Sequence, residues 1–171
     1  MTLALLSQSG GTRSAPIIGA DFAHPMLQRG LAKTRGKPIR LIEADALQLP
    51  LASGSVDLIV SAFGFRNLAD YDAGLKEIFR LLAPGGEIGI LDFSEPKGLL
   101  GRAYRVYFER VLPRIGTAIS GVSGPYAYLP ASVARFPEAD ELLTRMRAVG
   151  FSAVSWKAYT FGIAGLFRGR K

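Results

Sequence analysis

The sequence predicts an α/β fold of the doubly wound kind, with a mostly parallel sheet that ends in an antiparallel strand pair. Three observations lead to this prediction. Short apolar runs rich in β-branched residues alternate with amphipathic segments of helical period. Several of these runs finish in an acidic residue, and in open parallel sheets ligands bind outside the carboxyl ends of the strands. The chain has 171 residues, of which 49% are apolar, so we expect a single domain over residues 1–171.

The N-terminal third is expected to hold a strand, a helix and a second strand. In chain order, we predict the end of a helix at residues 1–8, a strand at 16–22, a helix at 24–35 and a strand at 39–46. The first strand carries Asp21 near its C-terminal end, and the second finishes in Asp45. Pro25 falls in the first turn of the helix, where proline is tolerated.

The stretch from residue 56 to residue 97 predicts a second βαβ unit. It holds a strand at 58–63, a helix that begins after Asp70 and stops at Pro84-Gly85-Gly86, and a strand at 87–93. Its helix has one apolar face, formed by Leu75, Ile78, Phe79 and Leu82. The carboxyl ends of the two strands place residues 62–67 and 92–97 on one rim, where we expect the functional site.

The chain changes character after residue 96. We predict a long helix at 99–118, a lid or binding loop at 120–137, a helix at 138–149, and an antiparallel strand pair at 151–161 and 162–167. Glycine and proline are too frequent in the first half of the predicted loop for regular structure.

The composition excludes several classes of function. With no cysteine and one histidine, disulfides, thiolate catalysis and a histidine metal cluster are excluded, and we expect no metal. No apolar run approaches the roughly 20 residues of a membrane-spanning helix, and no signal peptide is found, so we expect a cytoplasmic protein. The net charge of +7 is scattered, so we expect no nucleic-acid partner. A solvated face, peripheral contact with anionic lipid headgroups and a homodimer stay open.

Several motifs resemble one family of enzymes. They are FGFRN at residues 63–67, LAPGG at 82–86, LDFSEP at 91–96, PYAYLPASV at 125–133 and FP at 136–137. With them, nearly the whole chain resembles the menaquinone and ubiquinone C-methyltransferases, a group of class I S-adenosylmethionine-dependent enzymes. The resemblance implies a Rossmann-like fold, S-adenosyl-L-methionine as cofactor and a prenylated quinol as substrate.

One part of the family pattern is not found in the sequence. Family members have an N-terminal region and then a strand and glycine-rich turn of the form acid-x-x-x-G-T-G-D, whereas residues 1–6 resemble the family's segment just after that turn. We therefore expect the first strand of the fold to be missing. This strand is normally central, so its absence would leave backbone donors and acceptors unpaired. We expect weak or no binding of S-adenosylmethionine by this polypeptide in isolation.

The resemblance also implies residues that bind the cofactor. Asp21 matches the acid that accepts both ribose hydroxyls, with the cap of the following helix as the alternative. Asp45 and Ala46 match the pair that meets the adenine, through the carboxylate and a backbone N–H. Ala62 falls where many relatives carry a hydroxyl residue, so only a backbone contact is expected there.

Arg66 and Asn67 are the candidate catalytic residues. Between two buried segments, an arginine and an amide are costly unless they are paired. One interpretation places Arg66 beside the quinol oxygen, where it stabilises the developing phenolate, with Asn67 orienting it. The alternative is a structural bridge from Arg66 to Asp92 or Glu95. On the loop, Tyr126 and Tyr128 could close over the substrate ring, and packing roles are equally credible.

The sequence thus predicts C-methylation of a prenylated quinol, demethylmenaquinol or 2-polyprenyl-6-methoxy-1,4-benzoquinol, in quinone biosynthesis. Two alternatives stay open. One is a non-catalytic remnant of the family that acts as an assembly partner. The other is a small-molecule methyltransferase outside quinone synthesis.

Overall fold

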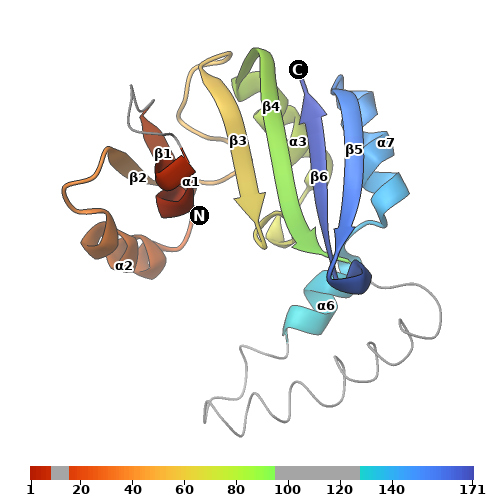
Figure 1. The fold of residues 1–171 in the computed structure, drawn as a ribbon, viewed down its shortest axis with the longest axis horizontal. Coiled ribbons are helices and arrows are strands. Elements are labelled where there is room, and N and C mark those ends of the chain that lie inside the picture. Colours follow the sequence, from red (N-terminus) through yellow and green to blue (C-terminus); the bar gives the residue numbers. More distant parts are fainter. Residues whose placement is uncertain (9–15, 95–127) are drawn as a thin grey trace, which may run out of the picture. The chain divides into compact units, whose positions relative to one another are not determined.

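The computed structural model describes residues 1–8, 16–94 and 128–171, which form two compact units (Figure 1). The first unit is Met1–Ala52 and the second is Ser53–Lys171. No described helix is long and apolar enough to cross a membrane.

The first unit is built on a two-stranded parallel sheet. Strand β1 (Ile17–Asp21) pairs with β2 (Ile39–Glu43) in continuous register, from Ile17 opposite Ile39 to Asp21 opposite Glu43. Helix α2 (His24–Thr34) connects the two strands, and α1 (Thr2–Gln8) precedes them. The predicted strand, helix and strand are thus confirmed. The second strand, however, ends at Glu43 and not at residue 46.

The second unit is a four-stranded mixed sheet in the order β3-β4-β6-β5. Strand β3 (Val56–Ala62) runs parallel to β4 (Leu82–Phe93), while β6 (Ala164–Arg170) runs antiparallel to both β4 and β5 (Ser152–Tyr159). Helices α3 (Tyr71–Leu81) and α7 (Ala139–Val149) lie behind this sheet in Figure 1. The predicted α/β fold with an antiparallel C-terminal pair is confirmed.

Both sheets have an open edge. Within the described residues, β1 pairs only with β2, and β3 pairs only with β4. Both of these strands therefore present unpaired backbone donors and acceptors on one side. Exposed apolar side chains lie on the same two strands, Ile18 on β1 and Leu58 on β3.

Helix α3 begins after Asp70, as the sequence predicts, but it ends at Leu81, before the predicted stop at Pro84-Gly85-Gly86. The carboxylate of Asp70, the N-cap residue, accepts a hydrogen bond from the backbone N–H of Ala73 at 3.0 Å. After Leu81 the chain enters β4 directly, so this strand begins at Leu82 and not at residue 87 as predicted. Gly86 is required in this turn because a Cβ there would lie 2.9 Å from the carbonyl oxygen of Ala83.

Residues 128–135 form helix α6 (Tyr128–Arg135), inside the segment predicted to be a lid or binding loop. The helix is stable here because Val133, together with Phe136 just beyond it, is buried. The predicted helix at 99–118 and the first half of the predicted loop lie outside the described residues.

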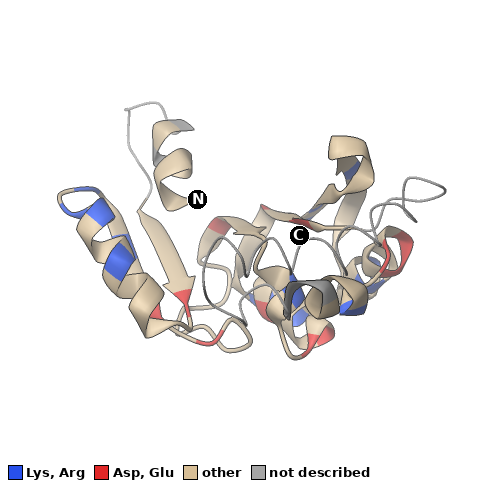
Figure 2. Ribbon diagram, turned by 90° about the horizontal axis from the view of Figure 1, so that it is seen from below, with Lys and Arg blue, Asp and Glu red and all other residues tan. Residues whose placement is uncertain are grey.

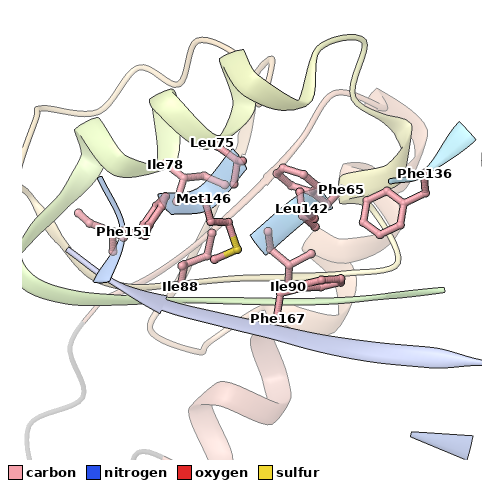
Figure 3. Packing of buried hydrophobic residues seen from close by; sticks show 11 residues of the cluster. Phe65, Leu75, Ile78, Ile88, Ile90, Phe136, Leu142, Met146, Phe151 and Phe167 are labelled. Carbon is pink, nitrogen blue, oxygen red and sulfur yellow. The ribbon is translucent and has the colours of Figure 1, made fainter. Parts of the chain in front are cut away.

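The hydrophobic core of the second unit lies between the sheet and the two helices behind it (Figure 3). Helix α3 supplies Leu75 and Ile78, and α7 supplies Leu142 and Met146, as the apolar periodicity of each helix predicts. The remaining members are Phe65, Leu82, Ile88, Ile90, Phe136, Phe151 and Phe167. Aromatic rings extend this core to the end of the sheet where β3 leads into the 3-10 helix η1 (Phe65–Asn67).

Candidate functional site

The residues predicted to form the site divide between the two units. Asp21, Asp45 and Ala46 belong to the first unit, and Ala62, Arg66 and Asn67 to the second. Tyr126 and the side chain of Tyr128 lie outside the described part of the chain.

Asp21 ends β1 with its side chain exposed to solvent. One carboxylate oxygen, Oδ1, accepts a hydrogen bond from the backbone N–H of Ala23 at 2.9 Å. The N-cap residue of α2 is Ala23 itself, and no side chain caps this helix. Asp21 therefore does not have the helix-capping role that was the alternative to cofactor binding.

Asp45 lies two residues beyond β2, which corrects the prediction that the strand runs through it. Its Oδ1 accepts a hydrogen bond from the backbone N–H of Leu47 at 2.9 Å. This local bond turns the chain away from the ladder and leaves Ala46 exposed within the turn. The backbone N–H of Ala44 bonds to the carbonyl oxygen of Asp21 at 3.1 Å, which ties the ends of the two strands together.

The chemistry of the two acids suits a ligand that carries hydroxyl or amino groups. In each, Oδ1 is held by a backbone N–H, and Oδ2 has no hydrogen-bond partner among the described residues. Figure 2 shows acidic residues at the arrowhead of β1 and basic residues along α2. An exposed carboxylate at the end of a parallel strand is a suitable acceptor for a ribose diol or an adenine amine.

The contacts of His24 at the same end of this sheet were not predicted. The Nδ1 atom of His24 lies 2.6 Å from the carboxylate of Glu43, and its Nε2 atom lies 3.0 Å from the amide nitrogen of Gln28. Glu43 is opposite Asp21 in the register. The contact therefore fixes the start of α2 on the end of β2. The sequence gives no signal for it because Glu43 and His24 are 19 residues apart.

In the second unit, Arg66 is almost fully buried and forms an ion pair with Asp92. Arg66 is 4% exposed and Asp92 0%. The Nη1 atom of Arg66 lies 3.0 Å from Oδ1 of Asp92, and its backbone N–H donates to Oδ2 at 3.0 Å. Oδ1 also accepts from the backbone N–H of Phe93 at 2.9 Å. The alternative interpretation, a bridge from Arg66 to Asp92, is thus confirmed as a contact.

Further contacts fix the guanidinium group. Its Nε atom donates to Oγ of Ser132 on α6 at 3.4 Å, and Nη1 also donates to the carbonyl oxygen of Phe63. The guanidinium carbon lies 5.1 Å from the centre of the Phe93 ring, a cation–π distance. Among the described residues, Nη2 has no hydrogen-bond partner. Arg66 therefore keeps one pair of buried N–H donors that no described residue uses.

The backbone of Arg66 is held as firmly as its side chain. Its carbonyl oxygen accepts from the hydroxyl of Tyr71 at 3.1 Å and from Nη2 of Arg135 at 3.3 Å. Arg66 therefore joins β4, α3 and α6 around η1. Asp92 was predicted on the same rim and as a structural partner of Arg66, but not as a catalytic or binding residue. Ser132 was predicted only as part of the PYAYLPASV motif, with no role of its own.

Ala62 and Asn67 lie on either side of this buried group. Ala62 is exposed at the end of β3, and Phe63 follows it with a φ of 57°, in the left-handed region. This turn places the Phe63 ring 4.7 Å from that of Phe93. Asn67 is exposed, and its contacts with described residues include a hydrogen bond only from its backbone N–H, to the carbonyl oxygen of Gly64 at 3.0 Å. Its amide is therefore available to a ligand.

A family model described as the ubiE/COQ5 methyltransferase family matches residues 1–171. The chain is 51% identical over 158 residues to a demethylmenaquinone methyltransferase of Thermus thermophilus, with coverage of 91% of this chain and 71% of the relative. For the enzyme of the same name in Deinococcus radiodurans the identity is 49%, with coverage of 91% and 65%. A ubiquinone/menaquinone biosynthesis C-methyltransferase of Geobacter sulfurreducens is 40% identical, with coverage of 92% and 63%. The chain thus spans about two thirds of the length of these curated relatives.

Solved structures agree on the fold. An S-adenosylmethionine-dependent methyltransferase of Thermotoga maritima matches with a TM-score of 0.64 at 22% identity, over 91% of this chain and 72% of that one. Another from Aquifex aeolicus matches with a TM-score of 0.66 at 16% identity, over 98% and 74%. At these identities the likeness concerns the fold alone.

Proposed function

The chain belongs to the ubiE/COQ5 methyltransferase family, and we propose that it performs S-adenosylmethionine-dependent C-methylation of a prenylated quinol in quinone biosynthesis. The names of its relatives support this class of substrate, since they are demethylmenaquinone and ubiquinone/menaquinone methyltransferases. S-adenosylmethionine is the cofactor expected of this family and this fold. Its sulfonium supplies an electrophilic methyl group.

The single observation that carries the proposal is the unused donor pair of Arg66. A buried guanidinium nitrogen without a partner is costly, and Nη2 has none among the described residues. A phenolic oxygen placed there would accept its hydrogen bonds. The ring carbon beside this oxygen becomes nucleophilic when the hydroxyl loses its proton, so a fixed positive group that stabilises the phenolate favours methyl transfer.

Asn67, Tyr126 and Tyr128 complete the proposed substrate site. The exposed amide of Asn67 can hydrogen-bond to the quinol next to Arg66. We assign the two tyrosines to contacts with the quinol ring, as the resemblance to the family implies.

We assign the adenosine half of the cofactor to residues of the first unit. Asp21 takes the ribose hydroxyls, while Asp45 and the backbone of Ala46 take the adenine. The support is their exposed position at the carboxyl end of the parallel strands, with one carboxylate oxygen of each acid held by a backbone N–H. At the end of β3, Ala62 contributes a backbone contact.

The test of this proposal is Arg66→Ala, made in the natural full-length protein. We expect methyl transfer to a short-chain demethylmenaquinol to fall by about 100-fold or more, with the affinity for S-adenosylmethionine nearly unchanged. Arg145→Ala is the matched control, because Arg145 also forms an ion pair of 3.0 Å but lies on the surface. Equal loss of methyl transfer and cofactor binding in Arg66→Ala would make Arg66 a structural residue instead.

A prenylated substrate resides in a lipid bilayer. We therefore propose that the protein is cytoplasmic and makes peripheral contact with the membrane. The net charge of +7 favours a surface that carries anionic headgroups.

A further inference from the structure

The hairpin that joins β5 to β6 ends in an aromatic side chain that projects into solvent. Phe161 lies in the 3-10 helix η3 (Thr160–Gly162) and is 87% exposed. In the described part of the chain, no other large apolar side chain is as exposed. Burial of such a ring in an apolar environment is favourable, so the ring is suited to a contact surface.

The backbone of the hairpin tip that carries this ring is strained. Thr160 has a φ of 50° and Phe161 a φ of 56°, both in the left-handed region. A β-branched residue such as threonine is a rare occupant of this region. The backbone is held by a hydrogen bond from Ile163 N to the carbonyl oxygen of Thr160 at 3.1 Å. At 87% exposure, little packing against the Phe161 ring offsets the strain, and backbone strain is a common property of functional segments.

Next to Phe161 are an aromatic ring and a cation that suit a lipid headgroup region. Tyr159 ends β5 and is 41% exposed. The ammonium group of Lys157 lies 5.4 Å from the centre of the Tyr159 ring. Tyrosine and lysine each combine an apolar body with a polar end, and both are favoured at the boundary between lipid and water.

The tip is fixed beside the candidate site of the second unit. Ser94 donates through its backbone N–H to the carbonyl oxygen of Ile163 at 2.9 Å, and through its hydroxyl to that of Gly162 at 2.7 Å. The preceding residue, Phe93, pairs with Ala164 and lies under the guanidinium group of Arg66. A membrane at the tip would thus be close to Arg66.

We infer that the tip of the β5–β6 hairpin docks on a bilayer with anionic headgroups. Phe161 enters below the headgroups, while Tyr159 and Lys157 remain at their level. The inference rests on the proposed function, because a prenylated quinol must be taken from a bilayer. It adds the surface through which the protein reaches this substrate.

The test is co-sedimentation of the chain with vesicles made of equal parts phosphatidylglycerol and phosphatidylcholine. We expect Phe161→Ala to weaken binding about tenfold. We expect Lys157→Gln to weaken it about threefold on these vesicles and not at all on vesicles of phosphatidylcholine alone. Phe22→Ala is the matched control, because Phe22 is 78% exposed in the first unit, and it should bind as the unchanged protein does. Since all three side chains are exposed, these variants should fold.

A second measurement locates the inserted residue. Trp156 is the one tryptophan of the chain, so Trp156→Phe provides a background for a new probe. In this background, we expect Phe161→Trp to shift its emission to the blue on anionic vesicles and to be quenched by brominated lipid. Phe22→Trp should show neither effect.

Unchanged vesicle binding by Phe161→Ala, equal quenching of both probes, or no binding of the unchanged chain would overturn the inference. These assays contain neither quinol nor S-adenosylmethionine. Their failure would therefore leave the proposed methyl transfer intact, and a failure of methyl transfer would leave membrane binding intact.

Discussion

Asp21 and Asp92 occupy equivalent places in their sheets, yet their surroundings differ completely. Each lies at the carboxyl end of a strand that has a parallel neighbour. Asp21 is exposed and uses one carboxylate oxygen, for the backbone N–H of Ala23. Asp92 is fully buried, and its two oxygens accept from Arg66 and from the backbone of Phe93.

The difference shows that burial decides what an acid at a strand end can do. A buried carboxylate must be paired, and breaking the pair leaves a charge in a medium of low dielectric. Asp92 is therefore committed to Arg66. An exposed carboxylate can exchange water for the hydroxyl groups of a ligand at little cost. Asp21 is therefore suited to bind a cofactor. Four predictions test this contrast.

The largest effect is expected for the buried acid. Asp92→Asn replaces an acceptor by an amide whose NH₂ group must face N–H donors of Arg66 or Phe93. We expect the free energy of unfolding of the chain to fall by about 3–5 kcal/mol, measured by urea denaturation. The control is Asp72→Asn, which breaks a partly exposed ion pair with Arg145 of the same 3.0 Å length and should cost less than about 1 kcal/mol. Similar losses of unfolding free energy in the two variants would show that burial does not set the strength of these ion pairs.

The exposed acid should affect binding and not stability. In the natural full-length protein, we expect Asp21→Asn to weaken the binding of S-adenosylmethionine by about 1.5–3 kcal/mol, because hydrogen bonds to a charged acceptor are lost. The free energy of unfolding should change by no more than about 0.5 kcal/mol. Calorimetric titration and urea denaturation measure the two quantities. A variant that binds the cofactor normally would rule out the ribose assignment.

Asp70 provides an intermediate case. Like Asp21 it is exposed and accepts one backbone N–H, but it caps α3. We expect Asp70→Ala to lower the free energy of unfolding by about 1 kcal/mol, because the first turn of the helix loses its acceptor. Asp21→Ala, measured beside it, should cost less. An equal loss would mean that the Ala23 contact of Asp21 supports the fold.

The smallest effect is expected for Ser132, at the edge of the buried group. Its hydroxyl oxygen accepts from Nε of Arg66 at 3.4 Å, which is long for a hydrogen bond. We expect Ser132→Ala to cost about 0.5 kcal/mol in thermal denaturation. A loss as large as that of Asp92→Asn would show that α6, and not Asp92, fixes the guanidinium group.

Much of the fold could be predicted because its signals are local. The apolar spacing of α3, its cap at Asp70 and the antiparallel C-terminal strands are all present in short stretches of sequence. The boundaries predicted for β2 and β4 were wrong because they depend on competing contacts. At Asp45 a side-chain hydrogen bond ends the ladder, and at Leu82 the chain enters the sheet before the glycine turn.

By itself, the sequence determined the α/β class, the family and the candidate acids, because periodicity and motifs need no knowledge of contacts. Only the tertiary structure decided that Asp92 is paired with Arg66 and that Ser132 contacts the same guanidinium group. It also separated the exposed Asp21 from the buried Asp92. The physical reason is that both burial and pairing arise from segments far apart in the chain. Arg66 and Ser132 are 66 residues apart, and no local pattern records that they meet.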